Sequence, residues 1–149
     1  MVTTDKIELA KQLSKHFHIG QKYGEYDYYE YHITGVIKTL ELIAKEVTED
    51  MIIVALLHDV LEDTECTWDT IYNIFGDNIT TAVSILTKSD QLSQADYIER
   101  IIRCKTPRIV KYADSLFNHQ ECIKAGDVKR AEKYQRNLTE LYHKELFKC

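Results

Sequence analysis

The sequence predicts an all-α fold, and three observations support this expectation. Its 149 residues include one proline and five glycines, so few residues interrupt helices. Apolar residues recur every three or four positions, which is the spacing of helices with one buried face. No run alternates apolar and polar residues for long enough to indicate a convincing strand. We therefore expect one helical domain over residues 1–149.

The composition supports a single core and excludes several classes of protein. Hydrophobic residues make up 44% of the chain, which suffices for the core of one domain. The apolar run at residues 51–57 is far shorter than the roughly 20 residues that span a bilayer, and the polar N-terminus does not resemble a secretory signal. The four cysteines are scattered without a CxxC motif, which argues against a disulfide framework or a zinc ribbon. We expect a cytoplasmic protein without a membrane partner.

Charge is unevenly distributed along the chain. The net charge of −5 argues against a general nucleic-acid binder, which would be strongly basic. Residues 46–87 contain nine Asp or Glu and no Lys or Arg, whereas residues 100–111 contain five Lys or Arg and no acid. The acidic stretch is therefore suited to binding a cation, and the basic stretch is suited to binding an anion. The alternative is that solvated helix faces of opposite sign attract each other in the fold.

The first third of the chain predicts two helices and a connecting segment. The first helix begins at Thr3 or Thr4 as its N-cap and ends near Gly20. Residues 21–31 form a turn-like segment with five tyrosines. These rings suit either a pocket wall that stacks a base or sugar, or an aromatic lid over the core. A second helix follows at residues 32–47.

The remainder of the chain predicts six more helices. A central helix is capped by Thr48 and runs to about Glu62. Thr67 caps the next, short helix, in which Trp68, Ile71, Ile74 and Phe75 face inward. Ser93 or Asp96 and Pro107 are suited to the starts of later helices. With the short helix included, the later helices lie at residues 67–76, 77–87, 93–102, 107–122 and from 126 to the C-terminus.

The centre of the chain predicts a metal site. Seven apolar residues, Met51–Leu57, lead directly into His58, Asp59, Glu62 and Asp63. Charges beside a core segment are costly unless a metal or counter-charge balances them. His58 and Asp59 are about 100° apart on a helix, so both reach one ion only over the groove between them.

Two other helices supply candidate ligands. His32 heads the helix before the centre, and apolar positions bracket Asp114, which turns its carboxylate inward. Two imidazoles and two carboxylates suit Mn²⁺, Fe²⁺ or Zn²⁺ and leave coordination positions for water. Glu62 and Asp63 follow His58 and Asp59 by four residues, where carboxylates can carry protons. The alternative is that these are ordinary surface or hydrogen-bonded residues.

Several motifs together resemble one enzyme family. The pattern of His32, His58-Asp59 and Asp114 is similar to the H…HD…D signature of the HD-domain metal-dependent phosphohydrolases. The segments ALLHDVLEDT and TWDTIYNIFGDNITTAVSILTK resemble the (p)ppGpp-hydrolase branch, which comprises the hydrolase domain of Rel/Spo proteins and the stand-alone small alarmone hydrolases. VKYADSLFN resembles that branch's VKLADRLHN, and the spacing from the GQ pair to His32 also agrees.

This resemblance implies an all-α HD-domain bundle of roughly eight helices around one Mn²⁺-like ion. It implies that water removes the 3′-pyrophosphate from guanosine tetra- or pentaphosphate, a small-molecule nucleotide substrate. By position, it implies metal ligands at His32, His58, Asp59 and Asp114, catalytic carboxylates at Glu62 and Asp63, and substrate contacts at Asn118, Arg130 and Tyr134. An exposed helical pair is the alternative for the last two residues. The basic residues 100–111 would add attraction for a polyphosphate.

The chain departs from the branch where the branch holds its nucleotide. Tyr23-Gly24 replaces Arg-Lys, Tyr28 stands at a proline, and Ile33 follows His32 in place of a second proline. One alternative is therefore an HD-domain phosphatase of another nucleotide, such as NADPH or a mononucleotide. The other is a non-catalytic nucleotide-binding module. No synthetase or regulatory region follows the hydrolase region, so we expect it to act alone. The pattern makes no prediction of oligomeric state.

Overall fold

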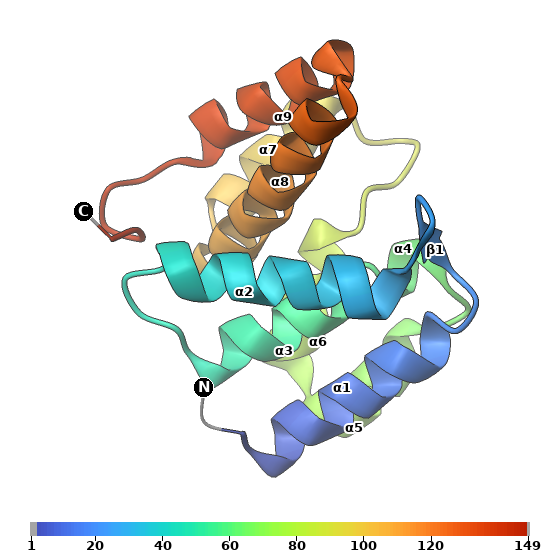
Figure 1. Ribbon diagram of the computed structural model, residues 1–149. Coiled ribbons are helices and arrows are strands. Elements are labelled where there is room, and N and C mark those ends of the chain that lie inside the picture. Colours follow the sequence, from blue (N-terminus) through green and yellow to red (C-terminus); the bar gives the residue numbers. More distant parts are fainter. Residues whose placement is uncertain (1–2, 149) are drawn as a thin grey trace.

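The computed structural model describes residues 3–148, and this part of the chain is almost entirely helical (Figure 1). The expected all-α class is confirmed. No helix within residues 3–148 is long and apolar enough to cross a membrane. The elements in order are α1 (Asp5–Phe17), β1 (Lys22–Tyr23), β2 (Tyr26–Asp27), the π-helical turn η1 (Tyr28–Ile33), α2 (Thr34–Ile43), α3 (Glu49–Leu57), α4 (Val60–Asp63), α5 (Trp68–Phe75), α6 (Asp77–Leu86), α7 (Gln94–Ile102), α8 (Lys105–Ala125) and α9 (Val128–Leu141).

Side-chain caps begin the helices where the sequence predicted them. The hydroxyl oxygens of Thr4, Thr48 and Thr67 each accept the backbone N–H three residues on, at 3.2 to 3.3 Å. Ser93 does the same for α7 at 3.1 Å. Gly126 ends α8 in the left-handed region, with φ of 74°, which only glycine adopts at little cost. Local chemistry therefore sets most of these boundaries.

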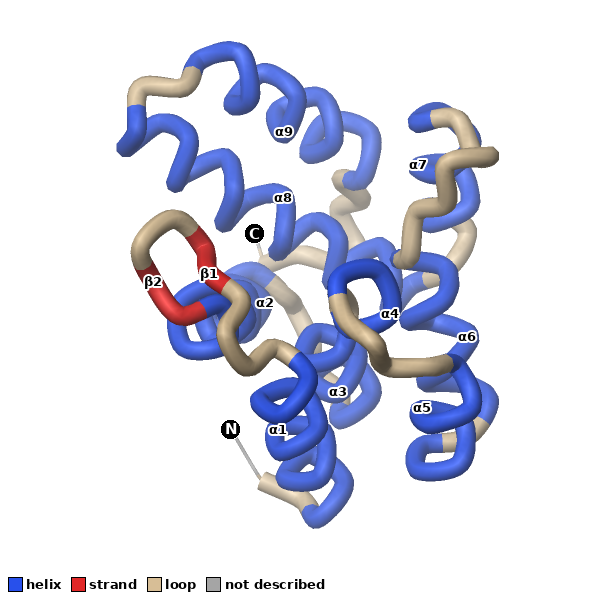
Figure 2. The backbone as a smooth tube through the Cα atoms, turned by 90° about the vertical axis from the view of Figure 1, so that its right-hand side faces the viewer, coloured by secondary structure: helices blue, strands red, loops and turns tan. Residues whose placement is uncertain are grey.

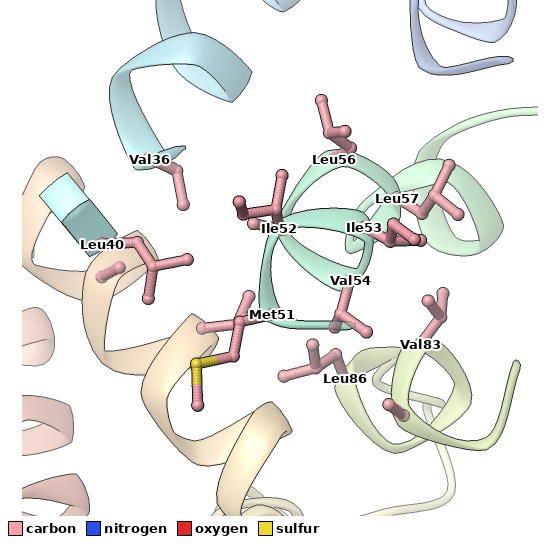
Figure 3. Close-up of a cluster of buried hydrophobic side chains, with 14 of the residues drawn as sticks. Val36, Leu40, Met51, Ile52, Ile53, Val54, Leu56, Leu57, Val83 and Leu86 are labelled. Atoms are coloured by element: carbon pink, nitrogen blue, oxygen red, sulfur yellow. The ribbon is translucent and has the colours of Figure 1, made fainter. Parts of the chain in front are cut away.

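Helix α3 is the centre of the core, as Figure 3 shows. All seven residues from Met51 to Leu57 are at most 4% exposed. A helix that is apolar all round needs neighbours on every side. It has them in α1, α2, α6 and α8, with Val36, Leu40, Val83 and Leu86 among the contacting side chains. The burial that holds α3 also fixes the position of His58, directly after it.

Gly35 lets α2 and α8 approach closely. A Cβ atom at this position would clash with a ring carbon of Phe117 on α8, so even an alanine would force the Phe117 ring or the two helices to shift. His32 precedes α2 and Asp114 lies one turn before Phe117. The close contact therefore brings two predicted metal ligands together.

Five local expectations are wrong, and the fifth, the extent of the central helix, is described in the next paragraph. Residues 21–31 contain a two-stranded antiparallel hairpin and not only a turn, and Figure 2 shows it between α1 and the α8–α9 pair. His32 lies in the π-helical turn η1 and not in an α-helix. Trp68 and Ile74 do not face inward, because they are 43% and 42% exposed. The last helix ends at Leu141, short of the C-terminus.

The central helix also differs from expectation, because it does not continue to Glu62. It ends at Leu57, and a second helix, α4, begins at Val60. Within residues 3–148, the thiols of Cys66, Cys104 and Cys122 are free, and Cys149 lies outside the described residues.

Candidate metal centre and its cavity

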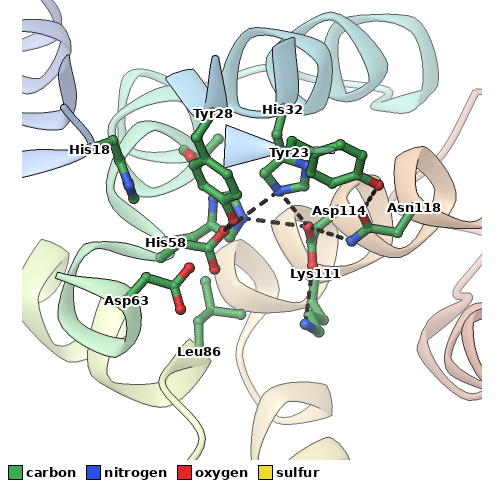
Figure 4. A network of polar contacts seen from close by, with 12 residues as sticks. His18, Tyr23, Tyr28, His32, His58, Asp63, Leu86, Lys111, Asp114 and Asn118 are labelled. Atoms are coloured by element: carbon green, nitrogen blue, oxygen red, sulfur yellow. Dashed lines mark hydrogen bonds and ion pairs between the residues drawn. The ribbon is translucent and has the colours of Figure 1, made fainter. Parts of the chain in front are cut away.

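Four side chains from three separate parts of the chain converge on one point, and Figure 4 labels three of them, His32, His58 and Asp114. The four are His32 from η1, His58 after α3, Asp59 before α4 and Asp114 from α8. One nitrogen or oxygen from each lies within 4.8 Å of the others. The two Nε2 atoms lie 3.0 to 3.5 Å from Asp59 Oδ2 and Asp114 Oδ1. This spacing leaves the four atoms facing a common centre.

The interruption between α3 and α4 aims two of these groups. Asp59 has φ of −105° and ψ of −4°, which departs from helical geometry and starts a new helical turn at the next residue. In a continuous helix, His58 and Asp59 would diverge by about 100°. In the structure, His58 Nε2 and Asp59 Oδ2 are 3.0 Å apart. The helix break therefore brings the two side chains to one point, which a continuous helix would allow only over the groove between them.

Both imidazoles are buried and held in orientation. His58 is 3% exposed, and its Nδ1 donates to the backbone oxygen of Ala55 at 2.6 Å. That bond turns the other ring nitrogen, Nε2, toward Asp59 and Asp114. Burial alone would lower the pKa of His58, but these two carboxylates outweigh it and raise the pKa. His32 is 1% exposed and stacks on Tyr23 with ring centroids 5.1 Å apart, while Phe117 meets it edge-on. Each ring thus directs one nitrogen at the cluster.

Asp114 has partners on every side. Its Oδ2 accepts from Lys111 Nζ, and its Oδ1 accepts from Asn118 Nδ2, both at 3.1 Å. Asn118 in turn accepts a 2.7 Å hydrogen bond from the Tyr23 hydroxyl. Helical spacing explains the set, because residues three and four apart on α8 share a face. Asn118 therefore braces a candidate ligand from a position lining the site.

Asp59 has a similar brace from Tyr28. The Tyr28 hydroxyl donates to Asp59 Oδ2 at 2.5 Å, and the tyrosine is 9% exposed. Burial and the charge of Asp59 raise the pKa of this phenol, so it stays a donor. Partners that orient metal-binding side chains in this way tune both geometry and affinity.

The cluster carries negative charge that is only partly balanced. Burial alone would raise the pKa of Asp114, but the ammonium of Lys111 and the two nearby imidazoles outweigh it and hold the pKa well below its ordinary value. Burial likewise opposes ionisation of Asp59, yet His58 and His32 hold its pKa low. Both groups are therefore carboxylates, and two carboxylates this close together, with Asp114 buried, favour a cation between them.

These groups fit a divalent metal ion. The unpartnered, buried Nε2 of His58 has a lone pair directed at two carboxylate oxygens, which is costly without a cation or proton there. Two nitrogen and two oxygen donors form a set used by Mn²⁺, Fe²⁺ and Zn²⁺, and four protein ligands leave room for water in a six-coordinate site. The structure therefore brings together all four predicted ligands in a suitable arrangement.

The cluster forms the floor of a cavity of about 300 Å³. Every predicted site residue except His58 lines it, and His58 lies in the floor beneath. Several further lining residues escaped the sequence prediction. The lining consists of Tyr23, Tyr28, His32, Asp59, Glu62, Asp63, Lys88, Gln94, Tyr97, Lys111, Asp114, Asn118, Arg130, Lys133, Tyr134 and Asn137.

Glu62 and Asp63 lie at the edge of this floor and are held from different sides. Glu62 Oε1 accepts the backbone N–H of Lys88 at 2.8 Å, and Asp63 Oδ2 accepts the Gln21 side-chain amide at 3.2 Å. Burial raises the pKa of both carboxyl groups, and the nearby charge of Asp59 adds to the rise. A raised pKa makes each carboxylate a better proton acceptor.

The basic residues 100–111 serve mainly to hold the fold together. Arg100 donates to the backbone oxygens of Ser84, Ile85 and Thr87, and Arg108 donates to those of Leu141 and Tyr142, while Arg103 pairs with Glu99 on the surface. Within that run, Lys111 is the residue that lines the cavity.

Helical spacing in the sequence could have identified some of the cavity-lining residues that were not predicted. Lys133 and Asn137 follow Arg130 at intervals that keep all three on one face of α9, together with Tyr134. Lys88 and Gln94 had no such signal, because they flank a loop whose path depends on the packing of α6 and α7.

Comparison with known proteins agrees with this geometry. Residues 29–137 match the HD domain family. The chain is 31% identical over 149 residues to a GTP pyrophosphokinase of Streptomyces coelicolor, with 94% of this chain and 17% of that protein covered. It is 30% identical to a guanosine-3′,5′-bis(diphosphate) 3′-pyrophosphohydrolase of Aquifex aeolicus, with 93% and 20% covered. The chain thus spans a fifth or less of the length of these bacterial relatives.

Two animal proteins are also similar. MESH1 of Danio rerio, named as a guanosine-3′,5′-bis(diphosphate) 3′-pyrophosphohydrolase, is 29% identical, with 69% of this chain and 62% of that protein covered. A solved structure, described as a metazoan ortholog of SpoT that hydrolyzes ppGpp, superposes with a TM-score of 0.76 at 22% identity and covers 95% of this chain and 85% of its own. The fold is therefore shared. With the family match extending over residues 29–137, this chain belongs to the HD domain family.

Proposed function

We propose that residues 1–149 form a single catalytic domain, a Mn²⁺-dependent hydrolase of phosphorylated nucleotides. Its proposed reaction is removal of the 3′-pyrophosphate from guanosine 3′,5′-bis(diphosphate). The observation that carries the proposal is the convergence of His32, His58, Asp59 and Asp114 on the floor of a cavity with cationic side chains. The names of the Aquifex aeolicus and Danio rerio relatives support the choice of substrate.

The proposed metal ligands are His32, His58, Asp59 and Asp114. When bound there, a divalent cation supplies a Lewis acid that makes water more acidic and offsets charge on a phosphoryl oxygen. Hydrolysis adds the oxygen of water to the phosphorus beside the ribose 3′ oxygen and breaks that P–O bond. A proton then returns to the ribose oxygen, and the products are pyrophosphate and guanosine 5′-diphosphate.

The carboxylates of Glu62 and Asp63 handle the protons in this scheme. Both line the cavity beside the floor, and both have a raised pKa that favours proton uptake. Each is also anchored, by the Lys88 N–H and by the Gln21 amide. Anchoring keeps a proton acceptor in a fixed place relative to the water.

The rest of the cavity suits a phosphorylated nucleotide. Lys88, Lys111, Arg130 and Lys133 line it with cationic side chains, although Lys111 is engaged with Asp114. Arginine and lysine are the common ligands of phosphate groups. Asn118 and Tyr134 add polar groups for the nucleoside. We assign Asn118, Arg130 and Tyr134 to substrate binding.

A nucleotide panel tests this function. The metal-stripped protein is incubated with Mn²⁺, Zn²⁺, Fe²⁺ or no metal, and with guanosine 3′,5′-bis(diphosphate), the pentaphosphate, NADPH and 2′- or 3′-mononucleotides. We expect pyrophosphate and guanosine 5′-diphosphate from the tetraphosphate, with the highest rate in Mn²⁺. An intact tetraphosphate beside a consumed competitor would contradict the proposed substrate while leaving the metal chemistry in place.

One observation favours keeping a second substrate class in the panel. Tyr23, which stands where the related branch has arginine, stacks on His32 and donates to Asn118 at the cavity wall. An uncharged ring there changes what the wall offers to a base or phosphate. The second candidate is therefore phosphatase action on NADPH or a mononucleotide. Binding of every nucleotide without turnover would indicate a non-catalytic module.

A further inference from the structure

His18 is a buried histidine outside the metal cluster. It caps the C-terminus of α1 and is 1% exposed. Its Nδ1 lies 2.6 Å from Gln21 Oε1, and its Nε2 is buried without a partner. Burial lowers the pKa of His18, so the ring is neutral and has a single proton. Because Gln21 Oε1 only accepts hydrogen bonds, that proton belongs on Nδ1.

Gln21 passes this orientation on to Asp63. With Oε1 committed to His18, the amide nitrogen Nε2 faces Asp63 Oδ2 at 3.2 Å. The opposite amide orientation would place an oxygen against the Asp63 carboxylate, which is repulsive, and would put the single His18 proton on Nε2, which is buried without an acceptor. The two hydrogen bonds therefore run in one direction, from His18 Nδ1 to Gln21 Oε1 and from Gln21 Nε2 to Asp63 Oδ2.

The backbone around Gln21 is held from both sides. Its N–H donates to the His18 oxygen at 3.0 Å, and its carbonyl accepts the N–H of Tyr28 at 3.0 Å. Gly20 makes this tight turn possible with φ of 82°. The Tyr28 ring also lies 4.9 Å from the His18 ring. The Gln21 side chain is thus presented from a fixed turn.

The two proton-handling carboxylates differ in how they are held. Glu62 accepts a backbone N–H, which no substitution removes easily, whereas Asp63 accepts a side-chain amide. Within residues 3–148, Gln21 is the side-chain donor to Asp63. A single substitution can therefore release Asp63 and leave Glu62 and the four candidate ligands in place.

We propose that His18 and Gln21 are positioning residues for Asp63: His18 fixes the orientation of the Gln21 amide, and the amide holds the Asp63 carboxylate in its catalytic position. The inference rests on the proposed function, since it concerns the carboxylate assigned there to proton handling. Neither residue touches the cavity, so neither is a substrate contact. The role is to restrict where one oxygen of Asp63 can lie.

Kinetics on the Mn²⁺-loaded protein test the role. We expect Gln21→Leu to lower kcat by about tenfold to a hundredfold, the usual effect of removing such an orienting partner, and to leave KM within about twofold. Gln21→Glu is expected to lower kcat further, because a second carboxylate would repel Asp63. The matched control is Ile19→Ala in the same turn, where the side chain is 77% exposed and kcat is expected not to change.

A double-mutant cycle separates positioning from a structural role. If His18 acts through Gln21, His18→Leu lowers kcat in the wild-type background but adds little to Gln21→Leu. His18→Asn keeps a donor toward Gln21 Oε1 and is expected to recover most of kcat. Additive losses for His18→Leu and Gln21→Leu, or a loss that persists unchanged in His18→Asn, would overturn the proposal.

A measurement without catalysis keeps the inference independent of the proposed function. In the metal-free protein, carbon NMR of the Asp63 carboxyl reports its titration. The Gln21 hydrogen bond lowers the pKa of Asp63, so Gln21→Leu is expected to raise it, whereas Ile19→Ala is not. An unchanged titration in Gln21→Leu overturns the inference. If no nucleotide in the panel is hydrolysed but this shift is seen, the proposed function fails and the hydrogen-bonded chain stands.

Discussion

The floor of the cavity is buried and braced, whereas its wall on α9 is exposed. His32, His58 and Asp114 are at most 4% exposed, and each has further contacts that orient it. Arg130 and Lys133 are exposed. Metal chemistry needs donor atoms within a few tenths of an ångström, while attraction of a polyphosphate tolerates side-chain motion. The contrast indicates that reaction type resides in the floor and substrate choice in the wall.

The largest effect is expected from breaking the floor. Asp59→Ala removes one of four donors and leaves the Tyr28 hydroxyl unpaired, so we expect loss of metal binding and of nearly all hydrolysis. Calorimetry with Mn²⁺ measures the first and the nucleotide assay the second. Asp69→Ala is the matched control on exposed α5, and full Mn²⁺ binding by Asp59→Ala would show that the cluster is not the metal site.

Next comes Asp63→Asn at the edge of the floor. We expect kcat to fall by about 10² to 10⁴, the usual contribution of a proton-transferring group, with metal binding intact. The free energy of unfolding at neutral pH is expected to rise, although kcat falls. Burial raises the folded-state pKa of Asp63, so its ionised form opposes folding above that pKa, and this cost disappears below the unfolded value of 3.8.

Thermal unfolding at two pH values checks that sign. At pH 7 we expect Asp63→Asn to have a higher Tm than the wild type, and below pH 3.8 we expect the difference to vanish. A lower Tm at pH 7 would mean that the Gln21 hydrogen bond outweighs the burial of the carboxylate.

A smaller effect is expected from the brace around the floor. Tyr28→Phe keeps the ring and removes the hydrogen bond to Asp59 Oδ2, so we expect Mn²⁺ affinity or kcat to fall by about tenfold to a hundredfold. The free energy of unfolding should fall by about 1 kcal/mol from loss of one buried hydrogen bond. Tyr72→Phe, on exposed α5, is the control, and equal behaviour of the two variants would remove Tyr28 from the site.

The smallest effect is expected in the α9 wall. Arg130→Ala should raise KM for the tetraphosphate by about tenfold, the worth of one charge-assisted hydrogen bond, while kcat stays within about twofold. Arg136→Ala makes the same charge change on another face of α9 and should leave KM unchanged. An equal rise in both variants would mean that net charge, and not a contact by Arg130, attracts the substrate.

Regular helices and the ligand set were accessible from the sequence because both depend on local pattern. Threonine and serine caps at Thr4, Thr48 and Ser93 act within three residues, so their signal is local. His58 and Asp59 stood out because charges follow an apolar run. The hairpin at residues 22–27 and the π-helical turn were missed, because their contacts to α8 lie nearly a hundred residues away, as in the Tyr23–Asn118 hydrogen bond.

The helix break at Asp59 shows the same limit inside a well-predicted segment. Nothing in the sequence VALLHDVLED marks an interruption of the helix, since neither proline nor glycine is present in Met51–Asp63. Similarly, the basic residues 100–111 look like an anion site, yet most of their guanidinium and ammonium groups are engaged with backbone oxygens or acids from other elements.

The sequence by itself determined that the chain is helical, that α3 is buried and which four residues are candidate metal ligands, because periodicity, caps and motif spacing are properties of short stretches. Only the tertiary structure decided how those ligands meet, which lysines and arginines reach the cavity, and that Gln21 holds Asp63. Those features depend on the approach of α2 to α8 at Gly35 and on the path of the hairpin, both of which are set by packing between distant segments.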